Sequence, residues 1–165
     1  MKTVTINQPV PDFIVPATNH KNVQLSALRG YNVILYFYSK DATPGCTIES
    51  QDFAANYSSF RATNTLVFGV SKNSLESHEQ FKAAQLLPFE LIADEEQTLC
   101  GLFDVIKPKT FKDQTFMGLV RSTFLVDSDG ILIKEWRDVS VKEHVHEVLA
   151  YCQKLIEPGL KSNIS

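Results

Sequence analysis

The segment NVILYFYSKDATPGCTIESQDF, residues 32–53, decides the fold class and holds a single cysteine, Cys46. Its first part is rich in β-branched and aromatic side chains, which predicts a strand covered on both faces in a parallel or mixed sheet. A helix is expected to begin between Pro44 and Cys46, because proline favours the first helical position and Thr43 can cap the helix. The segment therefore predicts a buried strand, a turn, and a helix whose first turn carries a thiol.

Outward from this segment, strand patterns alternate with helix patterns. One helix is expected to open with Ser74 as its cap and Glu76 in its first turn. Towards the C-terminus, two strands are joined by an Asp-Ser-Asp-Gly turn at 127–130, and Val141, Val145, Val148, Leu149, Cys152 and Ile156 form one apolar stripe of a last helix. The other expected elements are extended chain at 9–19, a cap and turn at 22–30, strands at 66–71 and 88–94, helices at 74–85, 95–105 and 140–156, and a polar loop at 106–115.

This order of elements predicts an α/β fold, a three-layer α/β/α sandwich with a mixed central sheet. The order is also that of the thioredoxin fold. A length of 165 residues without repeats or a linker is typical of one domain, so we expect a single domain over residues 1–165.

Composition and charge narrow the classes of partner. Sixteen Lys and Arg against 19 Asp and Glu give a net charge of -3, which argues against a broad surface for nucleic acid or anionic lipid. The start MKTVTINQPVPDF has no apolar run of the secretory type, and the apolar stretches have the length of strands. We therefore expect a cytoplasmic protein that binds neither nucleic acid nor a membrane.

The cysteines and histidines give no metal-site pattern. Cys46, Cys100 and Cys152 are widely spaced and odd in number, which predicts one reactive thiol and two buried ones in a reducing compartment. His78 is interpreted as a solvated surface residue rather than a base. His144 and His146 are two apart and should point to different faces of a helix, so no metal and no organic cofactor is expected.

Cys46 is the candidate nucleophile. A free thiol with a pKa of ~8.5 is mostly protonated at neutral pH, and the first turn of a helix lowers that pKa through unpaired N–H donors and the helix dipole. Thr43, three residues earlier, can direct its hydroxyl toward the sulfur or toward a bound oxygen atom. Arg121 lies among apolar residues of the strand GLVRSTFLVD, where a charge is costly unless paired, so its expected partners are the thiolate and Glu49.

Each of these residues also has a purely structural interpretation. A lone intracellular cysteine is more often a small buried hydrophobe, an arginine more often joins a structural salt bridge, and a threonine is often only a cap. The place of Cys46, at a helix start directly after a buried strand, favours function because that edge of an α/β sheet holds functional sites.

The segment FYSKDATPGCTIESQDF, residues 37–53, closely resembles the active-site segment of the peroxiredoxins of the bacterioferritin comigratory protein type, also called peroxiredoxin Q. The similarity continues through residues 74–105 and 121–136 and so covers nearly the whole chain. The resemblance implies a thiol-dependent peroxidase that reduces hydrogen peroxide and organic hydroperoxides through a cysteine sulfenic acid.

The resemblance also implies a role for each candidate residue. Cys46 is similar to the peroxidatic cysteine, and Thr43 to the residue whose hydroxyl contacts the peroxide. Arg121 resembles the arginine that steadies the thiolate and the transition state, and Glu49 the acid that orients this arginine.

Two positions depart from the family pattern. Ser39 stands where the wider family has a proline that shields the sulfur. Gln51 stands where many members carry the resolving cysteine, and the helix at 74–85 has no cysteine either. Cys100 and Cys152 both look like core residues, so we expect a one-cysteine enzyme recycled by an external thiol from thioredoxin, glutaredoxin or glutathione.

Other functions remain open at this point. A dithiol oxidoreductase of the thioredoxin type needs Cys-x-x-Cys, and Thr43 occupies the first position of that motif. A redox sensor without turnover, or a thioredoxin-fold binding module, is the non-enzymatic alternative. Members of the subfamily are often monomers, and a monomer is expected here.

Overall fold

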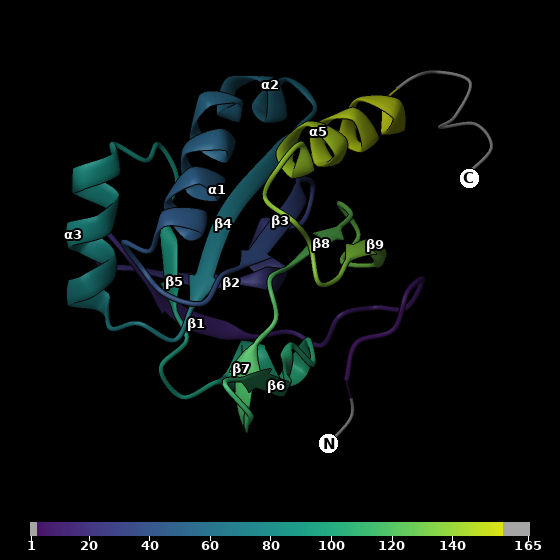
Figure 1. Ribbon diagram of the computed structural model, residues 1–165. Coiled ribbons are helices and arrows are strands. Elements are labelled where there is room, and N and C mark those ends of the chain that lie inside the picture. Colours follow the sequence, from purple (N-terminus) through teal and green to yellow (C-terminus); the bar gives the residue numbers. More distant parts are fainter. Residues whose placement is uncertain (1–2, 157–165) are drawn as a thin grey trace.

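A seven-stranded mixed sheet forms the centre of the molecule in the computed structural model, which describes residues 3–156 (Figure 1). The central strands β3, β4 and β5 are parallel, whereas β8 pairs antiparallel with β3, and β1 antiparallel with β5. The strand order is β2 (Lys21–Gln24), β1 (Ile14–Ala17), β5 (Leu91–Ala93), β4 (Thr65–Ser71), β3 (Asn32–Phe37), β8 (Ser122–Val126) and β9 (Leu132–Trp136).

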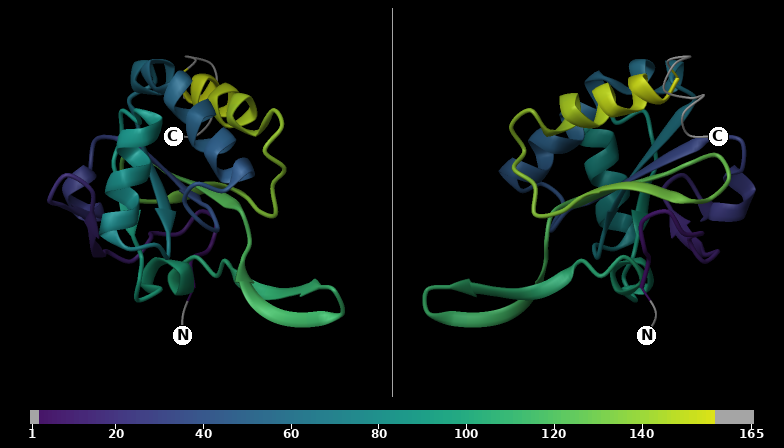
Figure 2. Two further views of the ribbon diagram at one scale, coloured as in Figure 1. Left: turned by 60° about the vertical axis from the view of Figure 1, so that its left-hand side comes forward. Right: turned by 90° about the vertical axis from the view of Figure 1, so that its right-hand side faces the viewer.

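Helices and loops cover both faces of the sheet, and each face has its own hydrophobic core. One core joins the sheet to α1 (Pro44–Ala55), α2 (Tyr57–Ala62), α3 (Leu75–Gln85) and α5 (His144–Leu155). The other joins it to the N-terminal segment, the 3-10 helix η1 (Leu25–Leu28) and α4 (Thr98–Leu102). Figure 2 shows α1 and α5 packed side by side above the sheet. The predicted three-layer α/β fold with a mixed sheet is confirmed.

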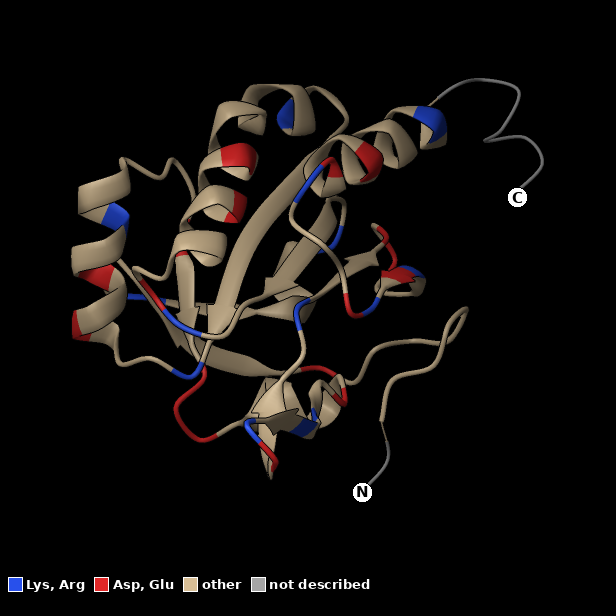
Figure 3. Cartoon of the chain, viewed as in Figure 1, with Lys and Arg blue, Asp and Glu red and all other residues tan. Residues whose placement is uncertain are grey.

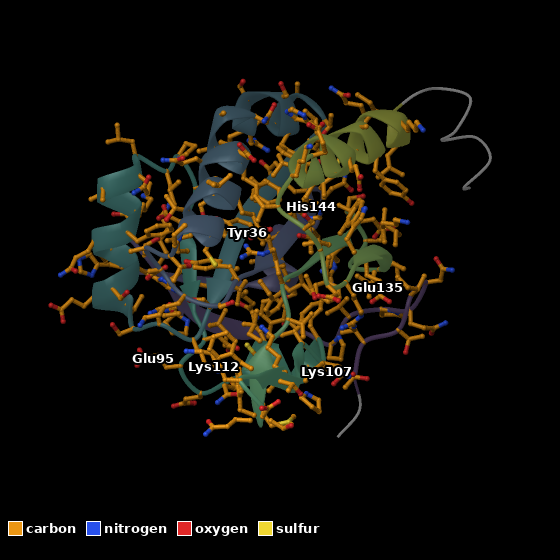
Figure 4. The ribbon with its side chains drawn as sticks, in the orientation of Figure 1. Tyr36, Glu95, Lys107, Lys112, Glu135 and His144 are labelled. Atoms are coloured by element: carbon orange, nitrogen blue, oxygen red, sulfur yellow. The ribbon has the colours of Figure 1, made fainter. Side chains whose placement is uncertain are left out.

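Tyr36 fixes α1 on the sheet and thereby fixes the site. The Tyr36 ring stacks on Phe53 with centroids 4.5 Å apart, and its hydroxyl lies 2.9 Å from Ser50 Oγ. A Cβ at Gly69 of β4 would lie 2.7 Å from the Tyr36 hydroxyl, so only glycine leaves room for this ring. Figure 4 places Tyr36 and His144 in the layer between the sheet and the helices.

Two strand pairs were not predicted. Residues 22–30 contain most of β2, which begins at Lys21 and forms a hairpin with β1 before η1 begins. Residues 106–115, predicted as a polar loop, form most of a second hairpin, β6 (Ile106–Phe111) and β7 (Gln114–Leu119), which projects from the body (Figure 2). Lys112 and Asp113 at its tip both have positive φ, 51° and 62°, as the two-residue turns that favour hairpins require. The prediction failed because most of this ribbon is exposed on both faces and has no apolar periodicity.

The remaining elements agree with the predictions except at their ends. Ser74 caps α3 as expected, with its hydroxyl accepting from Ser77 N. The last helix begins at His144 rather than at residue 140, so Val141 precedes it. Ile156 is 51% exposed and does not belong to the buried stripe.

Candidate active site

Cys46 lies in the first turn of α1, where the chain leaves β3 through the turn at residues 39–43. Proline occupies the first helical position, as predicted. Thr43 stands at the N-cap position, but its hydroxyl does not cap the helix and instead donates to Lys40 O at 2.8 Å. Thr43 therefore occupies the predicted N-cap position, but the predicted capping hydrogen bond is absent. Its hydroxyl instead closes the turn beside the sulfur.

The side chain of Arg121 contacts both Cys46 and Glu49. Its Nη2 lies 3.4 Å from Cys46 Sγ, and its Nη1 donates to Glu49 Oε1 at 2.7 Å. Arg121 sits between β7 and β8 rather than within a strand, and its carbonyl accepts from Val139 N at 3.0 Å. The structure thus brings Cys46, Glu49 and Arg121 together, although 75 residues separate the cysteine from the arginine.

Glu49 is completely buried one helical turn after Cys46. Its Oε1 holds the guanidinium, while Oε2 has no hydrogen-bond partner within residues 3–156. Burial raises the pKa of Glu49 to about 7, because desolvation of the charged carboxylate outweighs the attraction of Arg121.

The surroundings of Cys46 favour the thiolate. Burial by itself would raise the pKa of the thiol, but hydrogen bonds from the Thr43 hydroxyl and the Lys40 backbone, and the charge of Arg121, outweigh burial and lower that pKa. The single hydrogen of the Thr43 hydroxyl points at Lys40 O in this structure, with the hydroxyl beside the sulfur. The site therefore directs several donors at one sulfur atom.

The other two thiols have surroundings of the opposite kind. Cys100 of α4 and Cys152 of α5 are both buried, as predicted. Burial raises the pKa of Cys152 to about 12, and burial together with Asp94 raises that of Cys100 still further. Gln51 is exposed on α1, and its side-chain amide donates to Gln85 Oε1 of α3 at 2.6 Å.

Sequence reasoning missed a buried group of polar side chains behind the active-site turn. His78, interpreted as a surface residue, is completely buried, and its Nδ1 lies 2.7 Å from Asp41 Oδ2. The hydroxyl of Tyr38 donates to the other oxygen of Asp41 at 2.6 Å. The available signal was the spacing of His78 and Phe81, which puts both side chains on one face of α3.

No group of three or more potential metal ligands occurs among residues 3–156. His144 is buried and lies 2.8 Å from Thr123 Oγ1, whereas His146 is exposed beside Glu143. The two histidines of α5 thus face different ways, as their spacing predicted. Within the same residues, no helix has the length and apolar character needed to cross a membrane.

The chain is similar to proteins of known family. The profile of the AhpC/TSA family matches residues 6–135. Peroxiredoxin Bcp of Bacillus subtilis is 44% identical over 155 residues, which cover 94% of this chain and 99% of the relative. Peroxiredoxin Bcp of Xanthomonas campestris is 38% identical over 152 residues, covering 91% and 95% of the two chains.

Solved structures give the same result. A peroxiredoxin Q structure from Xanthomonas campestris superposes with a TM-score of 0.82 at 38% identity, covering 86% of this chain and 89% of the other. A cysteine-to-serine mutant of Xylella fastidiosa PrxQ superposes with a TM-score of 0.89 at 33% identity, covering 95% of this chain and all of the other. Another Xanthomonas structure is described as a trapped intermediate and ligand complex that bears on alkyl peroxide reduction.

Proposed function

The chain belongs to the AhpC/TSA family and is a peroxiredoxin, and from this membership we propose that Cys46 is the thiol that attacks the peroxide. A peroxiredoxin reduces hydroperoxides at the expense of a thiol, and this reaction is the function of the chain. The observation that carries the assignment of Cys46 is the guanidinium of Arg121, which joins this sulfur to a buried carboxylate.

The first step is a displacement at oxygen. The Cys46 thiolate attacks one oxygen of the hydroperoxide, an S–O bond forms, and the O–O bond breaks. Sulfur is oxidised to the sulfenic acid, and the second oxygen leaves as alkoxide or hydroxide and takes up a proton. Negative charge passes from sulfur to the leaving oxygen, so donors fixed around both atoms stabilise the transition state.

The donors divide this work between them. Arg121 and the Lys40 backbone stabilise the thiolate before attack, and the Thr43 hydroxyl, which donates to Lys40 O in the resting site, turns toward the peroxide when it binds. Glu49 orients the guanidinium through the 2.7 Å contact and, being buried, touches no substrate. We assign Cys46, Thr43 and Arg121 as catalytic residues and Glu49 as a positioning residue.

The oxidised enzyme is recycled by an external thiol. That thiol attacks the Cys46 sulfenic acid, water leaves, and a mixed disulfide remains, which a second thiol reduces. Two observations support a one-cysteine cycle: Gln51 occupies the place of the usual resolving cysteine, and the other thiols are buried with raised pKa values. Thioredoxin, glutaredoxin and glutathione supply thiols of the required kind.

The same proposal covers the setting of the enzyme. We place it in the cytoplasm as a monomer that acts on hydrogen peroxide and organic hydroperoxides without a metal or organic cofactor and without binding nucleic acid or a membrane. Sixteen Lys and Arg against 19 Asp and Glu give a net charge of -3, and Figure 3 shows residues of both signs on the helices and loops, which supports a protein without a nucleic-acid partner. A cytoplasmic setting also suits a cysteine that a reducing thiol pool must return to the resting state.

One experiment tests both the residue and the cycle. Reduced protein is treated with one equivalent of hydrogen peroxide, sulfenic acid is trapped with a dimedone-type reagent, and adducts and disulfides are mapped by mass spectrometry. We expect an adduct on Cys46 alone and complete loss of thiol-coupled peroxide turnover in Cys46→Ser. An oxidised wild type that never turns over with any thiol would instead indicate a redox sensor.

A further inference from the structure

The polar cluster behind the active-site turn belongs to three different segments. Tyr38 follows β3, Asp41 lies within the turn, and His78 lies on α3. Asp41 is 7% exposed and His78 is completely buried, so the cluster is shielded from water. None of the three residues contacts Cys46 through a hydrogen bond, and the reaction as described above does not use them.

The hydrogens of His78 follow from its two partners. Its Nε2 lies 2.9 Å from the carbonyl oxygen of Ile92, which can only accept, so Nε2 carries a hydrogen. Its Nδ1 faces Asp41 Oδ2 at 2.7 Å, a distance that requires a hydrogen between the two atoms. That hydrogen resides either on the imidazole or on the carboxyl group.

The surroundings of Asp41 favour its ionised form. The hydroxyls of Tyr38 and Ser77 donate to the two carboxyl oxygens at 2.6 and 2.7 Å. Burial alone would raise the pKa of Asp41, but the hydrogen bonds from His78, Tyr38 and Ser77 outweigh burial and lower that pKa. Asp41 is therefore a buried carboxylate held by hydrogen bonds from His78, Tyr38 and Ser77.

Asp41, one member of this pair, lies in the turn that carries Lys40 and Thr43 beside Cys46. Lys40, next to Asp41, accepts the Thr43 hydroxyl on its carbonyl at 2.8 Å, and its backbone helps to lower the pKa of the Cys46 thiol. The N–H of Asp41 itself donates to Asn73 Oδ1 at 3.0 Å. Ala42 has a φ of 64°, a conformation that alanine adopts only when its neighbours hold it there.

We propose that the buried hydrogen bond between Asp41 and His78 holds the active-site turn in the conformation that places Lys40 and Thr43 beside Cys46. Asp41 and His78 are then positioning residues for the peroxidase reaction, because neither touches the substrate. This inference rests on the proposed role of Cys46 as the attacking thiol. The proposed role differs from a contribution to the overall stability of the fold, because the pair acts on the sulfur only through the turn.

Two substitutions of His78 separate these roles. In His78→Asn the side-chain amide lies near the former Nδ1 and can still donate to Asp41, whereas in His78→Gln it lies near the former Nε2 and donates to Ile92 O. Each variant loses one of the two hydrogen bonds that the imidazole makes. Only His78→Gln releases the turn.

The readout is the pKa of the Cys46 thiol, taken from the pH dependence of its alkylation by mass spectrometry, with peroxide consumption measured in parallel. For His78→Gln we expect this pKa to rise by roughly one unit, the equivalent of one lost hydrogen bond to the charged sulfur. The rate constant with peroxide should fall by on the order of 10² because the donors are displaced. His78→Asn should keep most of both values.

Controls distinguish the proposal from loss of stability. Val126→Ala perturbs the core on the opposite face of the sheet. A urea concentration is chosen at which the unfolding free energy of Val126→Ala equals that of His78→Gln. The proposal is overturned if Val126→Ala shifts the thiol pKa as much, or if the two His78 variants behave alike. Should His78→Gln not fold, Tyr38→Phe removes one donor to Asp41, and an unchanged thiol pKa there overturns the proposal equally.

The experiment also separates this inference from the proposed function. A wild type that fails to reduce peroxide, combined with a raised Cys46 thiol pKa in His78→Gln, would reject the peroxidase role and leave the positioning role standing. A wild type that reduces peroxide, combined with equal thiol pKa values in all variants, would reject the positioning role alone.

Discussion

Arg121 serves two partners at once, and its shape explains why an arginine is needed. One nitrogen of the guanidinium contacts Glu49 Oε1 and another contacts Cys46 Sγ, so the plane of the group fixes the direction of its charge. A lysine ammonium is a point charge on a flexible stem and does not offer two donors in this fixed arrangement. The function of Arg121 therefore depends on geometry as well as on charge.

Arg121→Lys tests this distinction. We expect the Cys46 thiol pKa to rise and the rate constant with hydrogen peroxide to fall by roughly 10²–10³, the usual cost of one preorganised donor. Stopped-flow measurement of peroxide reduction, together with alkylation of Cys46 against pH, provides both values. A variant with the wild-type rate would show that charge alone suffices.

Glu49 makes stability depend on pH, with a sign that follows from its burial. Its folded-state pKa of about 7 lies above the ordinary value of 4.5, so the folded protein holds the proton more tightly than the unfolded chain does. The stabilisation is complete below pH 4.5 and is lost as the pH rises to about 7. Over this window the unfolding free energy should fall by up to about 3 kcal/mol on account of Glu49.

Glu49→Gln should remove this part of the pH dependence, because the amide does not titrate and still offers an oxygen to Arg121. Urea unfolding of both proteins across the same pH range provides the comparison. Parallel curves for wild type and variant would contradict the raised pKa of Glu49.

Most residues of the proposed site could be singled out from the sequence one by one. Short motifs of unusual composition contain all four residues, Cys46, Thr43, Glu49 and Arg121. A charged side chain among apolar residues, such as Arg121, is costly unless it is paired, which predicts a partner. His78 was not predictable in this way. Whether a histidine is surface or core depends on what packs over its helix, and here Asp41 arrives from a turn 37 residues away.

At the scale of elements, the helical form of α1 keeps positions 46 and 51 too far apart for a disulfide bond. It holds Cys46 against Arg121, yet residues five apart on an α-helix have Cα atoms ~9 Å apart and point in different directions. A disulfide needs Cα atoms within about 7 Å of one another. A resolving cysteine at position 51 therefore works only if the first turns of α1 unwind after oxidation.

Gln51→Cys tests whether this chain retains that capacity. We expect peroxide to produce an internal disulfide between Cys46 and the introduced thiol, accompanied by a loss of helical circular dichroism. The Gln51–Gln85 contact lies at the surface and should cost little to remove. Gln51→Ser is the matched control without a thiol, and a sulfenic acid that persists in Gln51→Cys would mean that α1 does not unwind.

Strand elements were predictable to the extent that they bury a face. The continuous apolar run of β3 predicted a central strand, the Asp-Ser-Asp-Gly turn at 127–130 predicted a hairpin, and both are present. The hairpin β6–β7 pairs with itself and exposes most of both faces, including Phe111 at 64% and Met117 at 61%. Its sequence therefore lacked the periodicity from which strands are recognised.

At the scale of the whole molecule, the sheet keeps the thiols apart. Cys100 belongs to the core on one face, while Cys46 and Cys152 belong to the core on the other. Cys152 is hydrogen-bonded to Thr65 at the start of β4, whereas Cys46 lies near the opposite ends of the strands. Seven residues of strand span ~20 Å, so neither buried thiol reaches Cys46 without dismantling a core.

This separation makes the one-cysteine cycle testable in the intact chain. In the double variant Cys100→Ser with Cys152→Ser, we expect peroxide turnover with an external thiol at the wild-type rate, because neither sulfur takes part. Some loss of stability is expected, since both side chains are buried and a hydroxyl replaces a sulfur in each core. Turnover is therefore compared at a temperature where both proteins are folded. A double variant that is oxidised once and then stops turning over would show that the chain resolves its own sulfenic acid. A Cys46–Cys100 disulfide in the wild type would show the same, and would mean that the two cores open far enough for these sulfur atoms to meet.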